Sequence, residues 1–180
     1  MKKMMCLAAA IGILSVVSLS GRQDVTFIHP GFGGSPHVLT QWTIAGATIG
    51  IEYGRPYLKG RTIGDDIVQH GQVWRVGADE ATTLTSDKAL VFGSLTLPPG
   101  GHTLWILPTA DKWQLIVNRE TGQFGTDYES EYDIGRVDMK LEKLSPPVEQ
   151  LTISIDPMPG GGTLRIEFGT AKATIPFKVK

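Results

Sequence analysis

Four cationic side chains lie in one stretch of the sequence that is punctuated by glycine and proline. They are Arg55, Lys59, Arg61 and Arg75. The planar guanidinium group of arginine donates paired hydrogen bonds to a carboxylate or a phosphate, so this stretch favours an anion site. Trp74 follows the same stretch and offers an aromatic wall for a sugar ring or another apolar group. The sequence therefore predicts that chemistry, if present, resides on this irregular loop.

Binding of a small anionic or glycan ligand is the first hypothesis for this loop. The cations grip the anion, Trp74 packs against the apolar part of the ligand, and Glu80 orients one of the cations. The predicted ligand-binding residues are Arg55, Lys59, Arg61, Trp74, Arg75 and Glu80. In this hypothesis the protein is a non-enzymatic scaffold or binding domain.

A hydrolase is the alternative function. Here Glu80 or Asp79 acts as general acid or base, and His70 carries the proton. Arg75 stabilises the negative charge that develops in the transition state. This hypothesis requires the groups to meet in an open cleft.

The same residues also fit a purely structural role. Arg55, Arg61 and Arg75 then pair with neighbouring acids and hold a long loop over one end of the fold. The candidate acids are Asp65, Asp66, Asp79 and Glu80. Trp74 plugs the core beneath the loop. A long loop has many backbone polar groups to satisfy, which favours such partners.

No other pattern predicts a metal or a cofactor. The histidines His29, His37, His70 and His102 are not spaced two or four residues apart, as zinc ligands on one strand or helical turn are. A group of acids at 120–133 favours a solvated loop, with weak calcium binding as the alternative. We therefore expect no metal ligands and no cofactor.

Residues 1–20 have the pattern of a secretory signal peptide. Lys2 and Lys3 precede a charge-free apolar run over 7–19, and small residues at 18–20 suit cleavage. The run is shorter than the roughly 20 residues that span a bilayer. We expect an exported protein, periplasmic or secreted, with no membrane span after cleavage and, once Cys6 is removed, no cysteine.

The charge of the chain is balanced. Its 17 Lys and Arg and 18 Asp and Glu give a net charge of −1, and neither sign is concentrated in runs. This pattern argues against nucleic acid and against an anionic membrane surface as partners. A small anionic or carbohydrate ligand remains as the expected partner, and the composition gives no oligomeric state.

Alternating apolar and polar residues predict β-strands in several places. The clearest alternation covers 49–53, 137–141, 151–155, 164–168 and 175–179, and the last three should be consecutive antiparallel strands. Residues 21–36 lack such a period and predict a flexible arm. One domain should then cover 37–180.

A central strand pair and many turns complete the predicted fold. Pro99-Gly100 fits a type II turn between 95–97 and 103–107. The segments 103–107 and 113–117 are apolar on both faces, which predicts burial on both sides. Only 64–70 offers one or two helical turns. About ten short strands with Gly and Pro turns predict an all-β antiparallel sandwich, jelly-roll or immunoglobulin-like.

A family resemblance rests on five groups of residues. They are Tyr53-Gly54-Arg55-Pro56 with Lys59-Gly60-Arg61, the run from Trp74 to Thr82, Leu97-Pro98-Pro99-Gly100, Trp113 with Asn118, and Ile134-Gly135-Arg136-Val137. Together they resemble the exported bacterial domains called domain of unknown function 2911, over essentially the whole chain from Pro36. The resemblance implies export and a β-rich fold, and it implies no activity. The chain departs from the family pattern at His102, where an aromatic is usual, and at Phe124-Gly125, where Trp-Gly is usual.

Overall fold

The alternating segments of the sequence form strands in the computed structural model, which describes residues 23–180. The predicted signal peptide, with Cys6, lies outside the described residues, as do Gly21 and Arg22. The strands are β1 (Gln23–His29), β2 (His37–Ile44), β3 (Ala47–Gly54), β4 (Thr83–Ser86), β5 (Leu90–Phe92), β6 (Leu95–Leu97), β7 (Gly100–Pro108), β8 (Trp113–Asn118), β9 (Asp133–Met158) and β10 (Gly161–Val179). A short 3-10 helix, η1, covers Ser130–Tyr132. The predicted all-β class is confirmed.

The ten strands form one hydrogen-bonded sheet in the order β1-β2-β3-β4-β7-β8-β9-β10-β5-β6. Every neighbouring pair is antiparallel. The sandwich of the predicted fold is not confirmed, because the ten strands belong to one continuous sheet. The predicted number of strands and their antiparallel pairing agree with the structure.

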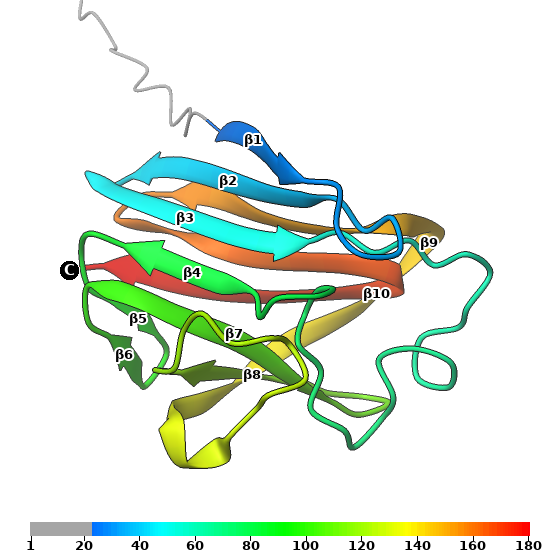
Figure 1. Cartoon of the computed structure of the whole chain (residues 1–180). Coiled ribbons are helices and arrows are strands. Elements are labelled where there is room, and N and C mark those ends of the chain that lie inside the picture. Colours follow the sequence, from blue (N-terminus) through cyan, green and yellow to red (C-terminus); the bar gives the residue numbers. More distant parts are fainter. Residues whose placement is uncertain (1–22) are drawn as a thin grey trace, which may run out of the picture.

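Strand β9 makes the sheet continuous while allowing it to form two layers. Its residues 133–139 pair with β8, whereas its residues 140–158 pair with β10. The sheet thus turns back on itself, and β9 and β10 lie behind β2 and β3 in Figure 1. Apolar side chains from both layers meet in one core, whose largest members include Trp42, Trp113 and Phe168. Their burial removes apolar surface from water and is the main force that holds the layers together.

The predicted central pair is confirmed. Strand β7 lies between β4 and β8, and its residues Leu104, Trp105 and Ile106 are all buried. Leu104 and Ile106 belong to the main core, while Trp105 packs with Ala81 on the opposite face of the sheet. A loop must therefore cover that second face of β7. This loop carries the candidate site.

The two strands on either side of Pro99-Gly100 do not form a hairpin. Strand β6 pairs with β5, and β7 pairs with β4 and β8. The short connection between them therefore joins two distant positions in the sheet order. Sequence adjacency alone could not show this.

Two of the predicted final strands are parts of one strand. Residues 164–168 and 175–179 both lie in β10, and 151–155 is the end of the long β9. Gly169, which lies between these two predicted strands, has φ +56° and lies where the pairing register between β9 and β10 shifts. Gly169 therefore forms an irregularity within one strand and does not form a turn between two strands.

The segment predicted as a flexible arm contains a strand. Residues Gln23–His29 form β1, which pairs with β2 at one edge of the sheet. The side chains of this strand are exposed up to Ile28, including Phe27 at 62%. Because neither face of β1 is buried up to Ile28, its sequence shows no sustained alternation between apolar and polar residues. The strand could therefore not be predicted from such alternation.

The connections contain little regular helix. Residues 64–70, the predicted helical turns, form turns and bends. Across residues 23–180 no helix has the length and apolar character needed to cross a membrane.

Candidate functional site

The loop of residues 55–82 joins β3 to β4 and crosses the open end between the two layers. At one end it is fixed to β9, where the backbone N–H of Leu58 donates to the carbonyl of Glu149 at 2.8 Å. Further on it is fixed to β7, where Trp74 and Ile106 exchange backbone hydrogen bonds of 2.7 and 2.9 Å. The loop therefore has fixed points on both layers, and side chains between those points hold defined positions.

Four residues of this loop other than glycine have a strained backbone: Lys59, Val68, Val76 and Asp79. Val76 and Asp79 have φ of 53° and 61°, in the left-handed region that residues other than glycine rarely adopt. The hydroxyl of Thr82 donates to the carbonyl of Val76 at 3.0 Å, and the N–H of Gly125 donates to the carbonyl of Asp79 at 2.8 Å. Strain of this kind costs about 1–3 kcal/mol per residue and concentrates at functional sites.

A pocket of about 430 Å³ opens beneath this strained segment. Its lining includes Tyr57, Lys59, Arg61, Trp74, Arg75 and Asp79. Four of the six predicted ligand-binding residues thus lie around one cavity. The volume falls within the range of about 300–1,000 Å³ that is typical of small-ligand sites.

The three cations of the pocket have no acidic partner among residues 23–180. Arg61 donates to the carbonyls of Tyr57 and Leu58 at 2.7 and 2.9 Å, and Lys59 Nζ lies 3.4 Å from the carbonyl of Gly33. These contacts orient the side chains without forming an ion pair, and the nearest acids are Asp79 in the same lining and Glu149, whose Oε1 accepts from the N–H of Lys59 at 3.0 Å. The ion pairs with Asp65, Asp66, Asp79 or Glu80 that the structural interpretation required are not formed in the described chain.

Arg75 is held by packing rather than by charge. Its guanidinium carbon lies 6.0 Å from the centre of the Phe124 ring. A side chain on the neighbouring Gly125 would place a Cβ atom 2.3 Å from Cδ of Arg75, so the glycine leaves room for the arginine. Arg75 lines the pocket, and it also lines a neighbouring cavity together with Gly125 and Tyr128.

Trp74 has the structural role that the sequence left open, and its position allows the binding role. Its ring stacks on Phe168 at a centroid distance of 6.2 Å and meets Trp113 edge-on at 5.8 Å, so it closes this end of the core. The same residue lines the pocket. It can offer one face of an aromatic wall without having to move.

Arg55 does not line the pocket. Its Nε donates to the carbonyl of Leu151 at 3.1 Å, and its Nη2 donates to Oγ1 of Thr152 at 3.2 Å. The N–H of Arg55 also donates to the carbonyl of Pro36 at 2.9 Å. Arg55 thus connects the start of the loop to β9 and to the segment before β2.

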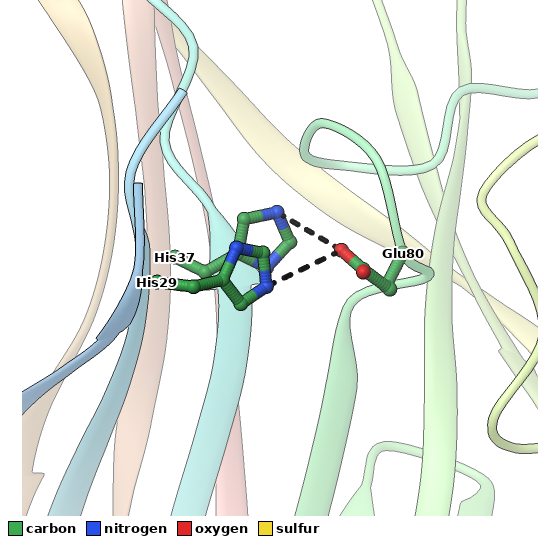
Figure 2. Close-up of side chains that lie close together, drawn as sticks. All are labelled: His29, His37 and Glu80. Atoms are coloured by element: carbon green, nitrogen blue, oxygen red, sulfur yellow. Dashed lines mark ion pairs between the residues drawn. The ribbon is translucent and has the colours of Figure 1, made fainter. Parts of the chain in front are cut away.

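Glu80 lies outside the pocket lining and faces two histidines (Figure 2). Its Oε2 is 3.2 Å from Nε2 of His37 and 3.7 Å from Nε2 of His29. The two imidazole rings are stacked, with centroids 4.2 Å apart and planes inclined by 17°. Among the described residues these three form the one group of His, Cys, Asp or Glu whose ligand atoms converge, all within 4.8 Å. We call His29, His37 and Glu80 the histidine cluster.

The strand pairing places the histidines together. His29 at the end of β1 is the register partner of His37 at the start of β2, and His37 is in turn the partner of Gly54 on β3. A Cβ atom on Gly54 would lie 2.5 Å from Nε2 of His37 and 2.4 Å from the carbonyl oxygen of Ala78. Glycine at position 54 is therefore required for His37 and the 55–82 loop to approach this closely.

Asp79 joins the histidine cluster to the pocket. Its carboxylate lines the pocket, and its Oδ2 lies 3.4 Å from Nε2 of His37. The same oxygen accepts a hydrogen bond of 2.8 Å from the N–H of Phe32. One acidic side chain thus touches the pocket, the histidine cluster and the connection between β1 and β2.

His70 lies apart from these groups. It lines a different cavity of about 350 Å³, together with Thr109 and Trp113. Arg75 and Glu80 do not line that cavity. The combination of Glu80, His70 and Arg75 that the hydrolase hypothesis required is therefore not assembled in one cleft.

Asp133, one of the acids in the stretch 120–133, forms hydrogen bonds within the protein. Asp133 accepts hydrogen bonds from the hydroxyl of Tyr128 at 2.8 Å and from Arg136 at 2.8 and 3.1 Å. Burial, followed by the hydrogen bond to Asp133, raises the pKa of Tyr128 to about 12. These contacts support the interpretation as an ordinary loop.

The spacing of the histidines in the sequence does not indicate the cluster, because its members do not lie close together on one element. His29 and His37 are eight residues apart, on two strands that the sequence did not pair. An interpretation of 23–29 as an edge strand, with a hairpin connection to 37–44, would have placed them opposite each other. Glu80 and Asp79 were recognised as candidate acids, but with other partners.

The arrangement is that of an all-β domain with a cationic pocket and a histidine–carboxylate cluster at one end of a single folded sheet. The profile of the family of proteins of unknown function DUF2911 matches residues 35–177. The chain belongs to this family, as its motifs indicated. No curated protein and no solved structure matched the chain significantly.

Proposed function

We propose that the protein is an exported, non-enzymatic binding domain that holds a small organic anion in the pocket of the 55–82 loop. The observation that carries the proposal is the convergence of Lys59, Arg61 and Arg75 on one cavity without an acidic partner in the described chain. The three cations outnumber the one acid of the lining, Asp79, and a net positive cavity attracts an anion and favours its retention.

The chemistry of the remaining lining indicates the class of anion. Tyr57 and Trp74 present aromatic surface on the same cavity, and 36% of Tyr57 is exposed. Aromatic rings pack well against the apolar faces of sugar rings. Guanidinium groups match carboxylate and phosphate. A sugar phosphate or a sugar acid combines both features, and we propose this class as the ligand.

The proposed place of action is the periplasm or the extracellular space. The support is the signal-like pattern of residues 1–20, together with the cysteine-free sequence that follows it. Isolation of the protein from a membrane-free extracellular or periplasmic fraction, with an N-terminus near Gly21, is the expected result. A cytoplasmic protein that retains Lys2 and Lys3 would contradict this part of the proposal.

Calorimetric titration of the purified protein with sugar phosphates, sugar acids and their neutral parent sugars tests the ligand proposal. We expect heat of binding for charged ligands and a much weaker signal for neutral ones. Salt should weaken the interaction because exposed charges are screened.

A matched pair of variants locates the site. Arg75→Gln should weaken binding by at least about tenfold, since a charge-assisted hydrogen bond contributes about 1.5–3 kcal/mol. Arg119→Gln is the control, because Arg119 also lies over an aromatic ring, 5.3 Å from the centre of Tyr132, but outside the pocket. Equal binding by both variants would place the ligand elsewhere.

A further inference from the structure

We propose that His29, His37 and Glu80 bind a divalent transition-metal ion, for which zinc is the suitable probe. The proposal does not depend on the anion pocket. Two imidazole nitrogens and one carboxylate oxygen within 4.8 Å of one another supply a donor set that zinc accepts while keeping a position open.

The state of His37 is the second, independent observation. The residue is only 1% exposed, and its Nε2 has no hydrogen-bond partner within residues 23–180. An unsatisfied buried polar atom costs about 1–3 kcal/mol, so such atoms are rare unless they serve a purpose. This nitrogen lies 3.2 Å from a carboxylate oxygen of Glu80 and 3.4 Å from one of Asp79, in positions that do not form hydrogen bonds. A cation between them would give the nitrogen a partner.

Metal binding requires one histidine ring to turn. A metal ion lies in the plane of the imidazole ring that binds it, whereas the two rings are stacked and inclined by only 17°. His37 is fixed between β1 and β3, with Gly54 against its ring. His29 is the ring that can move, because 35% of its side chain is exposed at the end of an edge strand.

Turning the ring of His29 also frees the required nitrogen. At present its Nδ1 accepts a hydrogen bond of 3.1 Å from the N–H of Gly31, which places the proton of the neutral ring on Nε2. Rotation breaks this bond, moves the proton to Nδ1 and leaves Nε2 available for the ion. The site therefore closes on the metal by a local movement of one side chain.

Asp79 has a supporting role in this proposal. Its Oδ2 is already occupied by the N–H of Phe32 at 2.8 Å, so we assign it to holding the connection between β1 and β2 against the loop. The mixed nitrogen and oxygen set discriminates against Mg²⁺ and Ca²⁺, which prefer oxygen ligands alone.

Zinc titration of the purified, tag-free protein after chelator treatment tests the proposal. We expect saturable binding of a single zinc ion, with much weaker binding of Mg²⁺. His29→Gln and Glu80→Gln should each weaken zinc binding by at least about tenfold, a loss that even an outer-shell partner of a metal site can cause. Both residues are partly exposed, so these variants should fold.

The control is His70→Gln, which removes an exposed histidine that lines a different cavity. It should bind zinc as the unmodified protein does. Visible absorption of bound Co²⁺ gives a readout of the ligand set, and its spectrum should be lost in His29→Gln. The proposal is overturned if the unmodified protein shows no saturable zinc binding. It is also overturned if His29→Gln and Glu80→Gln bind zinc as well as His70→Gln does.

Discussion

The hydroxyl group of Tyr53 exchanges hydrogen bonds with both backbone groups of Ile153, 100 residues further along the chain. It accepts from the N–H at 2.9 Å and lies 3.4 Å from the carbonyl, to which it donates. Tyr53 belongs to β3 and Ile153 to β9, so this contact connects the two layers through the core. Burial is the main cause that raises the pKa of Tyr53 above its usual value of 10.0.

Removal of that hydroxyl should destabilise the protein. Tyr53→Phe leaves two buried backbone groups of Ile153 without their partner, and we expect the free energy of unfolding to fall by about 1–3 kcal/mol. Urea denaturation followed by tryptophan fluorescence measures the change. Tyr57→Phe is the control, because that exposed side chain should change stability by less than about 0.5 kcal/mol. Equal denaturation midpoints for the two variants would contradict the role given to Tyr53.

Substitution of Arg55 should lower the stability of the protein more than substitution of Arg75 does. Arg55→Ala loses hydrogen bonds to Leu151 and Thr152 and should lower the free energy of unfolding by about 1–3 kcal/mol. Arg75→Ala loses its contact with Phe124, which contributes at most about 1 kcal/mol at a site of this kind. Thermal melting of both proteins under the same conditions provides the comparison. If Arg75→Ala proves the more destabilising, the pocket arginine is structural.

The stability of the protein should fall as the pH decreases below 6.5, the ordinary pKa of histidine, in part because of His102. Burial lowers the pKa of His102 below its ordinary value of 6.5. Between the lowered pKa and 6.5 the unfolded chain binds more protons than the folded chain, so stability decreases as the pH falls through this window. Melting temperatures at several pH values test this. His102→Phe should show a smaller decrease than the unmodified protein, and an identical decrease would contradict the assignment.

Gly125 should tolerate no side chain. A Cβ atom at this position would lie 2.3 Å from Cδ of Arg75 and 2.7 Å from the carbonyl oxygen of Asp79. The second contact is with backbone and cannot be relieved by a rotamer change, so Gly125→Ala should cost about 1–3 kcal/mol. Gly101→Ala, whose nearest contact would be 3.6 Å, should be almost neutral when both are compared by urea denaturation. Similar stabilities for the two variants would show that the segment can shift.

The fold was predictable wherever one face of a strand is buried. Ile49, Ile51 and Tyr53 alternate with polar or small residues because their face packs against the core, and this signal was sufficient to place β3. Strand β1 has no buried face, and its sequence therefore shows no such sustained alternation. Residues 164–168 and 175–179 were predicted as two strands, although a glycine such as Gly169 between them suits a turn and an irregularity within a strand equally well. Only the pairing partners of β9 and β10 distinguish these cases.

The pocket was more predictable than the histidine cluster. Lys59, Arg61, Trp74 and Arg75 lie on one loop, so their proximity in space follows largely from proximity in sequence. The cluster combines His29, His37 and Glu80 from two strands and a loop, and its formation depends on strand register. Proximity in sequence was not sufficient for Arg55, which was predicted to bind the ligand but forms hydrogen bonds to β9.

A single unbroken strand, β9, serves first as the neighbour of β8 and then as the neighbour of β10. Neither layer can therefore unfold without breaking hydrogen bonds of β9, which continues into the other layer. The chain should lose its order in one all-or-none transition, with the candidate site disappearing at the same temperature as the core.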